Sequence, residues 1–293
     1  MIRRNNLEFK IFIIYMSKIV PLIARCSRGQ QHYGVDFGGQ FLYRYFLESN
    51  YKFPNMLEVQ NKAFNNYTKG LDEIKNKTFS IFKNKQIPLV LGGDHSISYG
   101  SIKAALKHFN NNIHVLWIDS HTDINSLKES KTKNRHGMVV SSLMDINNEV
   151  WGSNEDVLQP GQITYFGIND VDPYEQKVID RLNINYIHRD EIQKKALHDM
   201  IPDNIPLYVS LDVDVFDKQF VACTGTPVDR GFEPELINFI LNHFNGQIIG
   251  MDIVEYNPFL GSVEDNKMSM FSIKNAVEPF LKYNEIVEQD ECI

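Results

Sequence analysis

Cysteine is scarce in this chain of 293 residues, and its scarcity excludes two ways of holding a fold together. The three cysteines, Cys26, Cys223 and Cys292, are far apart and form no CxxC pair. An odd number at such spacing argues against a disulfide framework and against a structural zinc site. A reducing compartment, the cytoplasm, is therefore the expected location.

An excess of basic residues is also missing. The formal net charge is -7, from 37 acidic and 30 basic residues. A general nucleic-acid-binding protein needs a basic surface, so no nucleic-acid partner is expected. Hydrophobic residues make up 43% of the chain, which is ample for a packed core and too many for a disordered chain.

Long apolar runs, internal repeats and flexible linkers are absent too. No stretch is long and apolar enough to cross a bilayer, so no membrane partner is expected. Arg3 and Arg4 precede a short apolar stretch at 11–16, but no small-residue cleavage site follows it cleanly. We expect residues 1–16 to be an N-terminal extension, with Met1 or Met16 as the natural start, and residues 17–293 to form a single domain.

The sequence does contain short apolar runs that alternate with helix-like segments. The runs are rich in Val, Ile, Leu and Tyr and are bounded by Gly, Asp or Asn, as buried parallel strands are. This alternation predicts one α/β domain with right-handed crossovers. The expected strands are 19–24, 88–91, 114–118, 163–168, 184–187, 207–213 and 248–253. The expected helices are 61–82, 98–109, 173–181, 190–200, 234–244 and about 267–283.

Four of the expected strands end in side chains that bind metals or carry charge. In a parallel α/β sheet the ligand crevice lies outside the carboxyl ends of the strands, so these residues should share one edge. Three short motifs and one glutamate stand at these ends: Gly92-Gly93-Asp94-His95-Ser96, Asp119-Ser120-His121-Thr122-Asp123, Asp212-Val213-Asp214 and Glu255.

The spacing within these motifs predicts that their side chains converge. The acidic and histidine residues are two apart, and residues at i, i+2 and i+4 of an extended segment point to one face. The Gly-Gly pair before His95 allows a tight turn that projects this side chain into the crevice. The expected metal ligands are His95, Asp119, His121, Asp123, Asp212 and Asp214.

The charge of this set predicts how many ions it holds. Buried carboxylates repel one another and shift their pKa values until some are neutral. Four carboxylates carry four negative charges, which two divalent cations would balance. The mixed oxygen and nitrogen ligand set suits Mn²⁺, although ligand type alone leaves zinc, Fe²⁺ and Co²⁺ open.

Taken together, the motifs resemble those of the ureohydrolases, the family of arginase and agmatinase. The resemblance covers most of the chain from about Gly34 to Asn257 and includes residues 224–228 and 251–258. It implies a three-layer α/β/α sandwich with a mainly parallel central sheet, and a dinuclear manganese centre. Asp119 and Asp212 would bridge the two ions. One ion would take His95, Asp119, Asp123 and Asp212, and the other Asp119, His121, Asp212 and Asp214.

The resemblance also implies a substrate, L-arginine. The loops after Asp123 and around 170–175 look like arginase loops that hold the α-carboxylate and α-amino group of an amino acid. In this interpretation three residues face the carboxylate and two face the ammonium group. The carboxylate set is Asn125, Thr132 and Asn134, and the ammonium set is Asp172 and Glu175. Tyr174 departs from the family pattern, which commonly has Gly there.

The implied reaction is hydrolysis of the guanidinium group to urea and L-ornithine by a hydroxide that bridges the two ions. Glu255 would pair with the guanidinium, and Asp123 would accept a hydrogen bond from the nucleophile. His136 would carry a proton to the departing amine. Thr226 would help position Glu255 or the guanidinium. By analogy with the family, a homo-oligomer, a trimer or hexamer, is expected.

Three alternatives remain beside this reading. The nearest is agmatinase, guanidinobutyrase or formimidoylglutamase on the same scaffold. A metal-binding regulatory protein without catalysis is less favoured, because all six ligands are present together with His136 and Glu255. A dinuclear metallophosphatase would be expected to show an Asn ligand and basic phosphate clamps, and neither is found.

Overall fold

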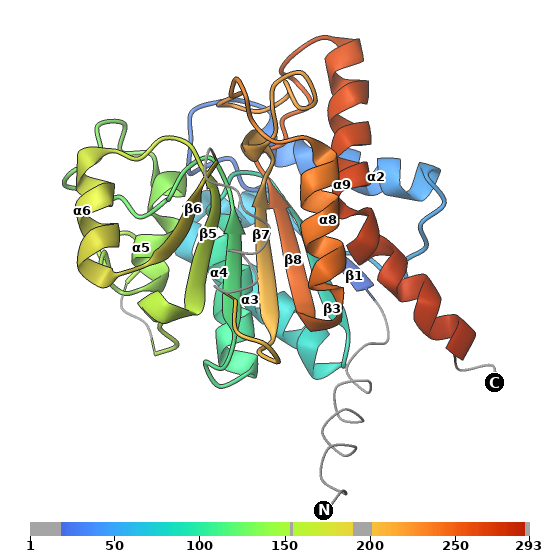
Figure 1. Cartoon of the computed structure of the whole chain (residues 1–293), viewed down its shortest axis with the longest axis horizontal. Helices are drawn as coiled ribbons and strands as arrows, with labels where there is room; N and C mark the ends of the chain where they lie inside the picture. The colour runs from blue at the N-terminus through green and yellow to red at the C-terminus, as the bar shows by residue number, and fades with distance from the viewer. Residues whose placement is uncertain (1–18, 153–154, 190–200, 291–293) are drawn as a thin grey trace, which may run out of the picture.

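A single parallel sheet forms the middle of the molecule (Figure 1). The structure, a computed structural model, describes residues 19–152, 155–189 and 201–290. The strand order in the sheet is β2-β1-β3-β8-β7-β4-β5-β6, and every neighbouring pair is parallel. The strands are β1 (Ile19–Ala24), β2 (Leu57–Val59), β3 (Ile87–Gly92), β4 (His114–Ile118), β5 (Ile163–Ile168), β6 (Asn185–His188), β7 (Leu207–Asp212) and β8 (Ile248–Val254).

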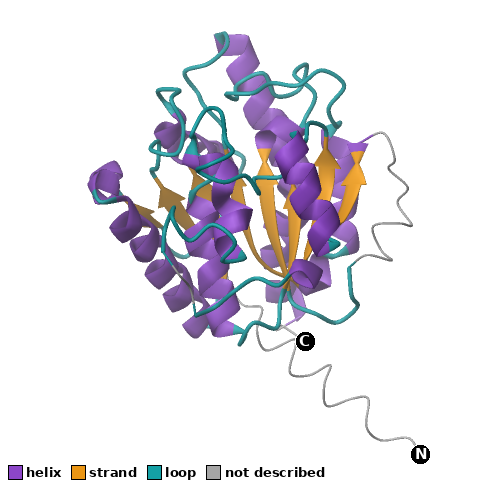
Figure 2. Cartoon of the chain, turned by 90° about the vertical axis from the view of Figure 1, so that its left-hand side faces the viewer, coloured by secondary structure: helices purple, strands orange, loops and turns teal. Residues whose placement is uncertain are grey.

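Helices cover both faces of this sheet (Figure 2). On one face they share a core with β1 and β4, and on the other with β7 and β8. The predicted three-layer α/β/α sandwich is therefore confirmed. The first layer contains α3 (Tyr67–Lys83), α4 (Ile97–His108), α5 (Val139–Leu143) and α6 (Pro173–Leu182). The second contains α2 (Gly38–Glu48), α8 (Pro234–His243) and α9 (Val263–Asp290).

The local sequence explains why these elements form where they do. Every residue of β1, β3, β4, β5 and β7 is buried, which is why these strands appear as near-continuous apolar runs. Helix α6 begins with a capping box, in which the Asp172 side chain accepts the backbone N–H of Glu175 while Glu175 reaches back to the N–H of Asp172. It ends at Asn183, whose φ of 50° suits a left-handed C-cap.

Most expected elements are present: β1, β4 and β5 have the expected bounds, most others are shifted by one residue at one or both ends, and α9 (Val263–Asp290) begins four residues before and ends seven residues after the expected helix. Three elements were missed: α2, α5 and β2. Helix α2 was missed because it begins with Gly38 and Gly39, which are poor helix formers. A Cβ at Gly38 would overlap the Tyr256 carbonyl, and one at Gly39 would overlap the Leu91 carbonyl. Close packing of this helix end against the sheet therefore requires glycine.

The segment 61–82 is divided into a 3₁₀ turn, Asn61–Asn65, and α3, because the Asn66 side chain accepts the backbone N–H of Lys69 as an N-cap. The helix expected at 190–200 lies outside the described residues. Among the helices that are described, none has the length and apolar character needed to span a membrane.

Candidate metal centre

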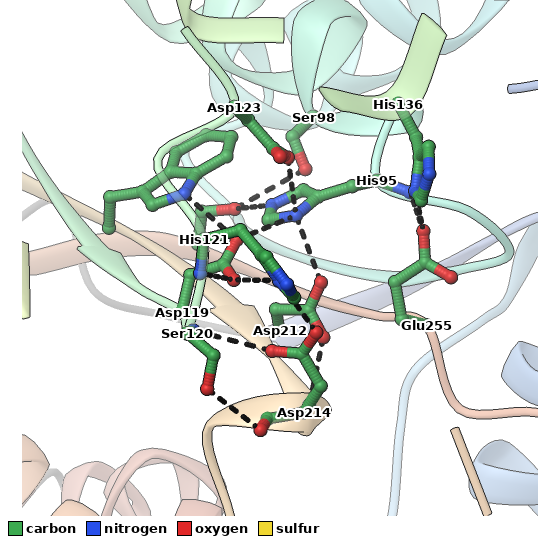
Figure 3. Close-up of polar contacts among 12 residues, drawn as sticks. His95, Ser98, Asp119, Ser120, His121, Asp123, His136, Asp212, Asp214 and Glu255 are labelled. Carbon is green, nitrogen blue, oxygen red and sulfur yellow. Dashed lines mark hydrogen bonds and ion pairs between the residues drawn. The ribbon is translucent and has the colours of Figure 1, made fainter. Parts of the chain in front are cut away.

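Four neighbouring strands, β3, β8, β7 and β4, bring the candidate ligands and Glu255 to one edge of the sheet. His95 follows β3, Asp119 follows β4, Asp212 ends β7 and Glu255 follows β8. Strand order explains the convergence, because segments far apart in the chain become neighbours at their carboxyl ends. Figure 3 shows the six predicted ligand side chains gathered in one cluster, with His136 and Glu255 beside it.

His95 is the centre of the first group of ligand atoms. Its Nδ1 lies 3.1 Å from Asp119 Oδ2, 3.2 Å from Asp123 Oδ2 and 3.1 Å from Asp212 Oδ2. This buried nitrogen faces three carboxylate oxygens, yet none of them lies in hydrogen-bond geometry with it. A lone pair and three oxygens aimed at a common point fit a shared cation, and His95, Asp119 and Asp212 offer atoms within 4.8 Å of one another.

His121 is the centre of a second group. Its Nδ1 lies 2.9 Å from Asp214 Oδ2 and 3.5 Å from Asp119 Oδ1. The ligand atoms of Asp119, His121 and Asp214 also lie within 4.8 Å of one another. Asp119 belongs to both groups, with Oδ2 near His95 and Oδ1 near His121. Its position between them is the one that a bridging carboxylate would occupy.

The side chains converge as predicted, but the predicted reason, alternation along extended strands, is wrong. We predicted that alternation along extended strands would point the side chains to one face, but only Asp212 lies on a strand. Asp119 and Asp123 lie in the loop after β4, and Asp123 adopts a left-handed φ of 46°. Asp214 lies in a 3₁₀ turn, Val213–Val215, started by the Asp212 side chain, which accepts the Asp214 N–H. Turns, and not strand alternation, aim these carboxylates.

The buried carboxylates of the cluster repel one another, which favours a bound cation. Burial and the nearby charges of Asp214 and Asp119 raise the pKa of Asp212 well above its usual value. Burial opposes ionisation of Asp119 too, but His121 and His95 hold the pKa of that carboxyl below its usual range. All four carboxyl residues are at most 6% exposed. Divalent cations would remove the repulsion that these buried groups exert on one another.

A row of side chains across three neighbouring strands contacts the candidate metal ligands, and it was not predicted from the sequence. Trp117, Ser210 and Asp252 are register partners on β4, β7 and β8. Ser210 Oγ lies 2.9 Å from His95 Nε2 and donates to Asp252 Oδ1 at 2.6 Å. Since the Ser210 hydroxyl proton faces Asp252, its oxygen accepts from His95 Nε2–H, which leaves the Nδ1 lone pair for a cation.

Trp117 supports the same residues from the neighbouring strand. Its ring stacks on the His95 imidazole, with centroids 4.2 Å apart and planes 6° apart. Its Nε1 donates to Asp119 Oδ2 at 3.0 Å. The signal for this row was the presence of Ser and Asp inside buried strands, but their contacts depend on strand order and register. Asp94, in the same motif as His95, accepts the backbone N–H groups of Gly29 and Ser96.

His136 and Glu255 form an ion pair at the side of the cluster. Glu255 Oε1 accepts from His136 Nδ1 at 2.8 Å and from the backbone N–H of His95 at 2.9 Å. Burial lowers the pKa of His136, but the Glu255 carboxylate outweighs it and raises the pKa to about 9. Glu255 therefore favours the protonated imidazole, the form that can donate a proton.

The residues expected at the amino-acid end of the substrate lie in two loops that touch each other. Asn125 Nδ2 donates to Asp172 Oδ2 at 2.6 Å. The other oxygen of Asp172 caps α6 by accepting from Tyr174 N and Glu175 N. Tyr174 therefore fits the first turn of this helix without displacing Glu175 from the capping box. Burial raises the pKa of Glu175 to about 7.

The remaining predicted residues lie at two different places. Thr132 is exposed, and its Oγ1 accepts the Asn134 N–H at 3.3 Å, so this pair shapes the loop before His136. Thr226 Oγ1 donates to Asp214 Oδ2 at 2.6 Å. Its observed contact is thus with a candidate metal ligand, whereas we expected it to position Glu255 or the guanidinium.

Comparisons with known proteins agree with this geometry. A model of the arginase family matches residues 25–278. Arginase of Plasmodium falciparum (isolate 3D7) is 31% identical over 244 residues, which cover 73% of this chain and 59% of that protein. Arginase of Eremothecium gossypii is 36% identical over 192 residues, covering 60% of this chain and 48% of that protein. The match thus spans about half to three fifths of the length of these relatives. The crystal structure of arginase from Bacillus subtilis has a TM-score of 0.80 at 25% identity, covering 90% of this chain and 98% of that one.

Proposed function

The chain belongs to the arginase family, and from this premise we propose that it hydrolyses the guanidinium group of L-arginine to urea and L-ornithine. One observation carries the proposal: the two ligand groups that share Asp119 lie beside the His136–Glu255 pair. A cation site alone would suit many proteins. A buried carboxylate and a protonated imidazole next to it suit a reaction that binds a cation and releases an amine.

The residues fit a pair of divalent cations, which we propose to be Mn²⁺. His95, Asp123 and Asp212 would hold one, and His121 and Asp214 the other, with Asp119 between them. When bound, such ions supply Lewis-acid chemistry and make hydroxide available from water near neutral pH. Asp212, whose Oδ2 lies 3.1 Å from His95 Nδ1, would bridge the two ions together with Asp119.

The side chains in and beside the cluster would have separate roles toward the substrate. Glu255 is 4% exposed, and its carboxylate would pair with the guanidinium and orient the central carbon. Asp123 would accept a hydrogen bond from the attacking nucleophile. His136 Nδ1 would hold its proton against Glu255 and release it to the amine that departs as ornithine.

The amino-acid end of the substrate would lie against the two loops joined by the Asn125–Asp172 hydrogen bond. Asn125, Thr132 and Asn134 would face the α-carboxylate. Asp172 and Glu175 would face the α-ammonium group. Agmatine has no α-carboxylate, so an enzyme specific for agmatine would have no use for the first set.

The direct test is urea release after loading with Mn²⁺, with L-arginine and agmatine as substrates, and L-glutamate release from formimidoylglutamate. We expect rapid urea release from arginine and little reaction with the other two. Preferential cleavage of agmatine would overturn the assignment of the substrate. Expression in the cytoplasm and assembly into a trimer or hexamer are part of the same proposal, and light scattering of the purified protein measures the assembly.

A further inference from the structure

Glu255 has a third hydrogen-bond donor that is distant from it in the sequence. Gln30 Nε2 donates to Glu255 Oε2 at 2.8 Å. The other oxygen, Oε1, already accepts from His95 N and His136 Nδ1. An ionised carboxylate offers about four acceptor positions. Three are therefore occupied, and the remaining one is on Oε2, the oxygen that Gln30 holds.

The orientation of the Gln30 amide is itself fixed. Its Oε1 accepts the backbone N–H of His32 at 2.9 Å, so turning the amide over would break both hydrogen bonds. The residue before it is anchored through both of its backbone polar groups: Gly29 N donates to Asp94 Oδ2 at 2.8 Å, and His136 N donates to Gly29 O at 3.3 Å. A Cβ at Gly29 would overlap the Ser96 hydroxyl, so the backbone passes here only as glycine.

We propose that Gln30 is a positioning residue for the guanidinium end of the substrate: it fixes the Glu255 carboxylate so that the open position on Oε2 accepts a guanidinium N–H. This inference rests on the proposed function, because it assumes that Glu255 pairs with a guanidinium. A guanidinium is planar, with N–H groups in a fixed fork, and it aligns its carbon only against a carboxylate that is held in one plane. Without Gln30, Oε2 loses its protein donor and the carboxylate is held through Oε1 alone.

The role predicts an effect confined to one end of the substrate. Gln30 has no hydrogen bond to Asn125, Thr132, Asn134, Asp172 or Glu175, the set proposed for the amino-acid end. L-ornithine has the same amino-acid end as L-arginine and no guanidinium. Loss of Gln30 should therefore impair arginine turnover and leave ornithine inhibition unchanged. General damage to the loop would weaken both.

The test uses Gln30→Met, which keeps the length of the side chain and removes both hydrogen bonds. We expect kcat/KM for L-arginine to fall by about ten- to a hundredfold, as for a lost hydrogen bond to a charged group. The inhibition constant of L-ornithine and the bound Mn²⁺ should stay within about twofold of the wild type. Gln31→Met is the matched control, because Gln31 is the adjacent, exposed residue of the same type, and it should behave as the wild type.

Two results would overturn the inference: an unchanged kcat/KM in Gln30→Met, or a parallel loss of ornithine inhibition. If the wild type cleaves agmatine and not arginine, the proposed function fails and the comparison is repeated with agmatine, which also carries a guanidinium. If it cleaves neither, calorimetry compares arginine binding by the wild type and Gln30→Met. Equal affinities would then rule out the role of Gln30.

Discussion

Ser210 shows how a single hydroxyl can control a metal ligand. It accepts from His95 Nε2 and donates to the buried Asp252 carboxylate, so it fixes which imidazole nitrogen faces the cations. Partners of this kind typically change metal affinity by about ten- to a hundredfold. We predict that Ser210→Ala lowers the Mn²⁺ affinity by this factor in a chelator-competition titration, with an unchanged circular dichroism spectrum.

Ser101 provides the control for that prediction. Its hydroxyl donates to the other oxygen of Asp252 at 2.9 Å, and no hydrogen bond joins it to His95. Ser101→Ala should therefore leave the metal affinity near that of the wild type. Equal losses in both variants would mean that the buried network acts on stability in general and not on the orientation of His95.

His136 should affect chemistry without affecting metal binding. Its side chain is hydrogen-bonded to Glu255 and forms no hydrogen bond or ion pair with any of the six candidate ligands. We predict that His136→Asn lowers kcat by about a hundredfold or more, the usual contribution of a general acid, while bound Mn²⁺ is unchanged. Elemental analysis alongside the urea assay checks both parts, and His243→Asn on α8 is the control. A full kcat in His136→Asn would exclude the proton-transfer role.

Strand β4 begins with a buried histidine, and this makes the stability of the element depend on pH. His114 is 2% exposed, its Nε2 lies 2.9 Å from Thr164 Oγ1, and burial lowers its pKa from 6.5 to about 4. The unfolded chain takes up the proton near pH 6.5, whereas the folded chain does so only near pH 4. The stability from the neutral imidazole is thus complete above about pH 6.5 and is lost as the pH falls toward 4.

Urea unfolding of the chelator-treated protein at about pH 7 and about pH 5 measures this effect. In His114→Gln the amide cannot be protonated and still reaches Thr164. We predict that the wild type loses about 2 kcal/mol more than this variant between the two pH values. Equal losses would show that His114 is protonated in the folded protein.

Elements differed in how far the sequence could predict them. Strands such as β4 and β5 were predicted with their exact bounds because they are buried along their whole length. Helix α2 was not predicted because it begins with two glycines, which are poor helix formers. These positions require glycine because the backbone of other segments lies too close for a Cβ. The short strand β2 has only three residues, two of them half-buried, and gives too little pattern to detect.

The sequence predicted which residues form the candidate site, but not the contacts that hold those residues in place. The ligand residue types and their places at strand ends were present in the sequence. The contacts of Gln30, Trp117 and Asp252 were not, because each depends on which strands and loops are neighbours. Gln30 and Glu255, for example, are 225 positions apart. Interactions of that range are set by the whole fold and leave no local pattern.

At the scale of the whole molecule, the order of the sheet creates the site. Strands β3, β8, β7 and β4 are neighbours in space although not in sequence, and their carboxyl ends bring together residues from 95 to 255. Cations bound there would connect segments that are separate in the unfolded chain. Binding should therefore stabilise the fold, by about 2.7 kcal/mol when free Mn²⁺ is a hundred times its dissociation constant.

The most direct measurement is the number of Mn²⁺ ions bound per chain, by equilibrium dialysis and elemental analysis. The two ligand groups that share Asp119 predict two ions per chain in the wild type, and a loss of metal and activity together in Asp119→Ala. A wild-type chain that binds no Mn²⁺, or an Asp119→Ala variant that keeps full activity in chelator-treated buffer, would contradict the dinuclear centre.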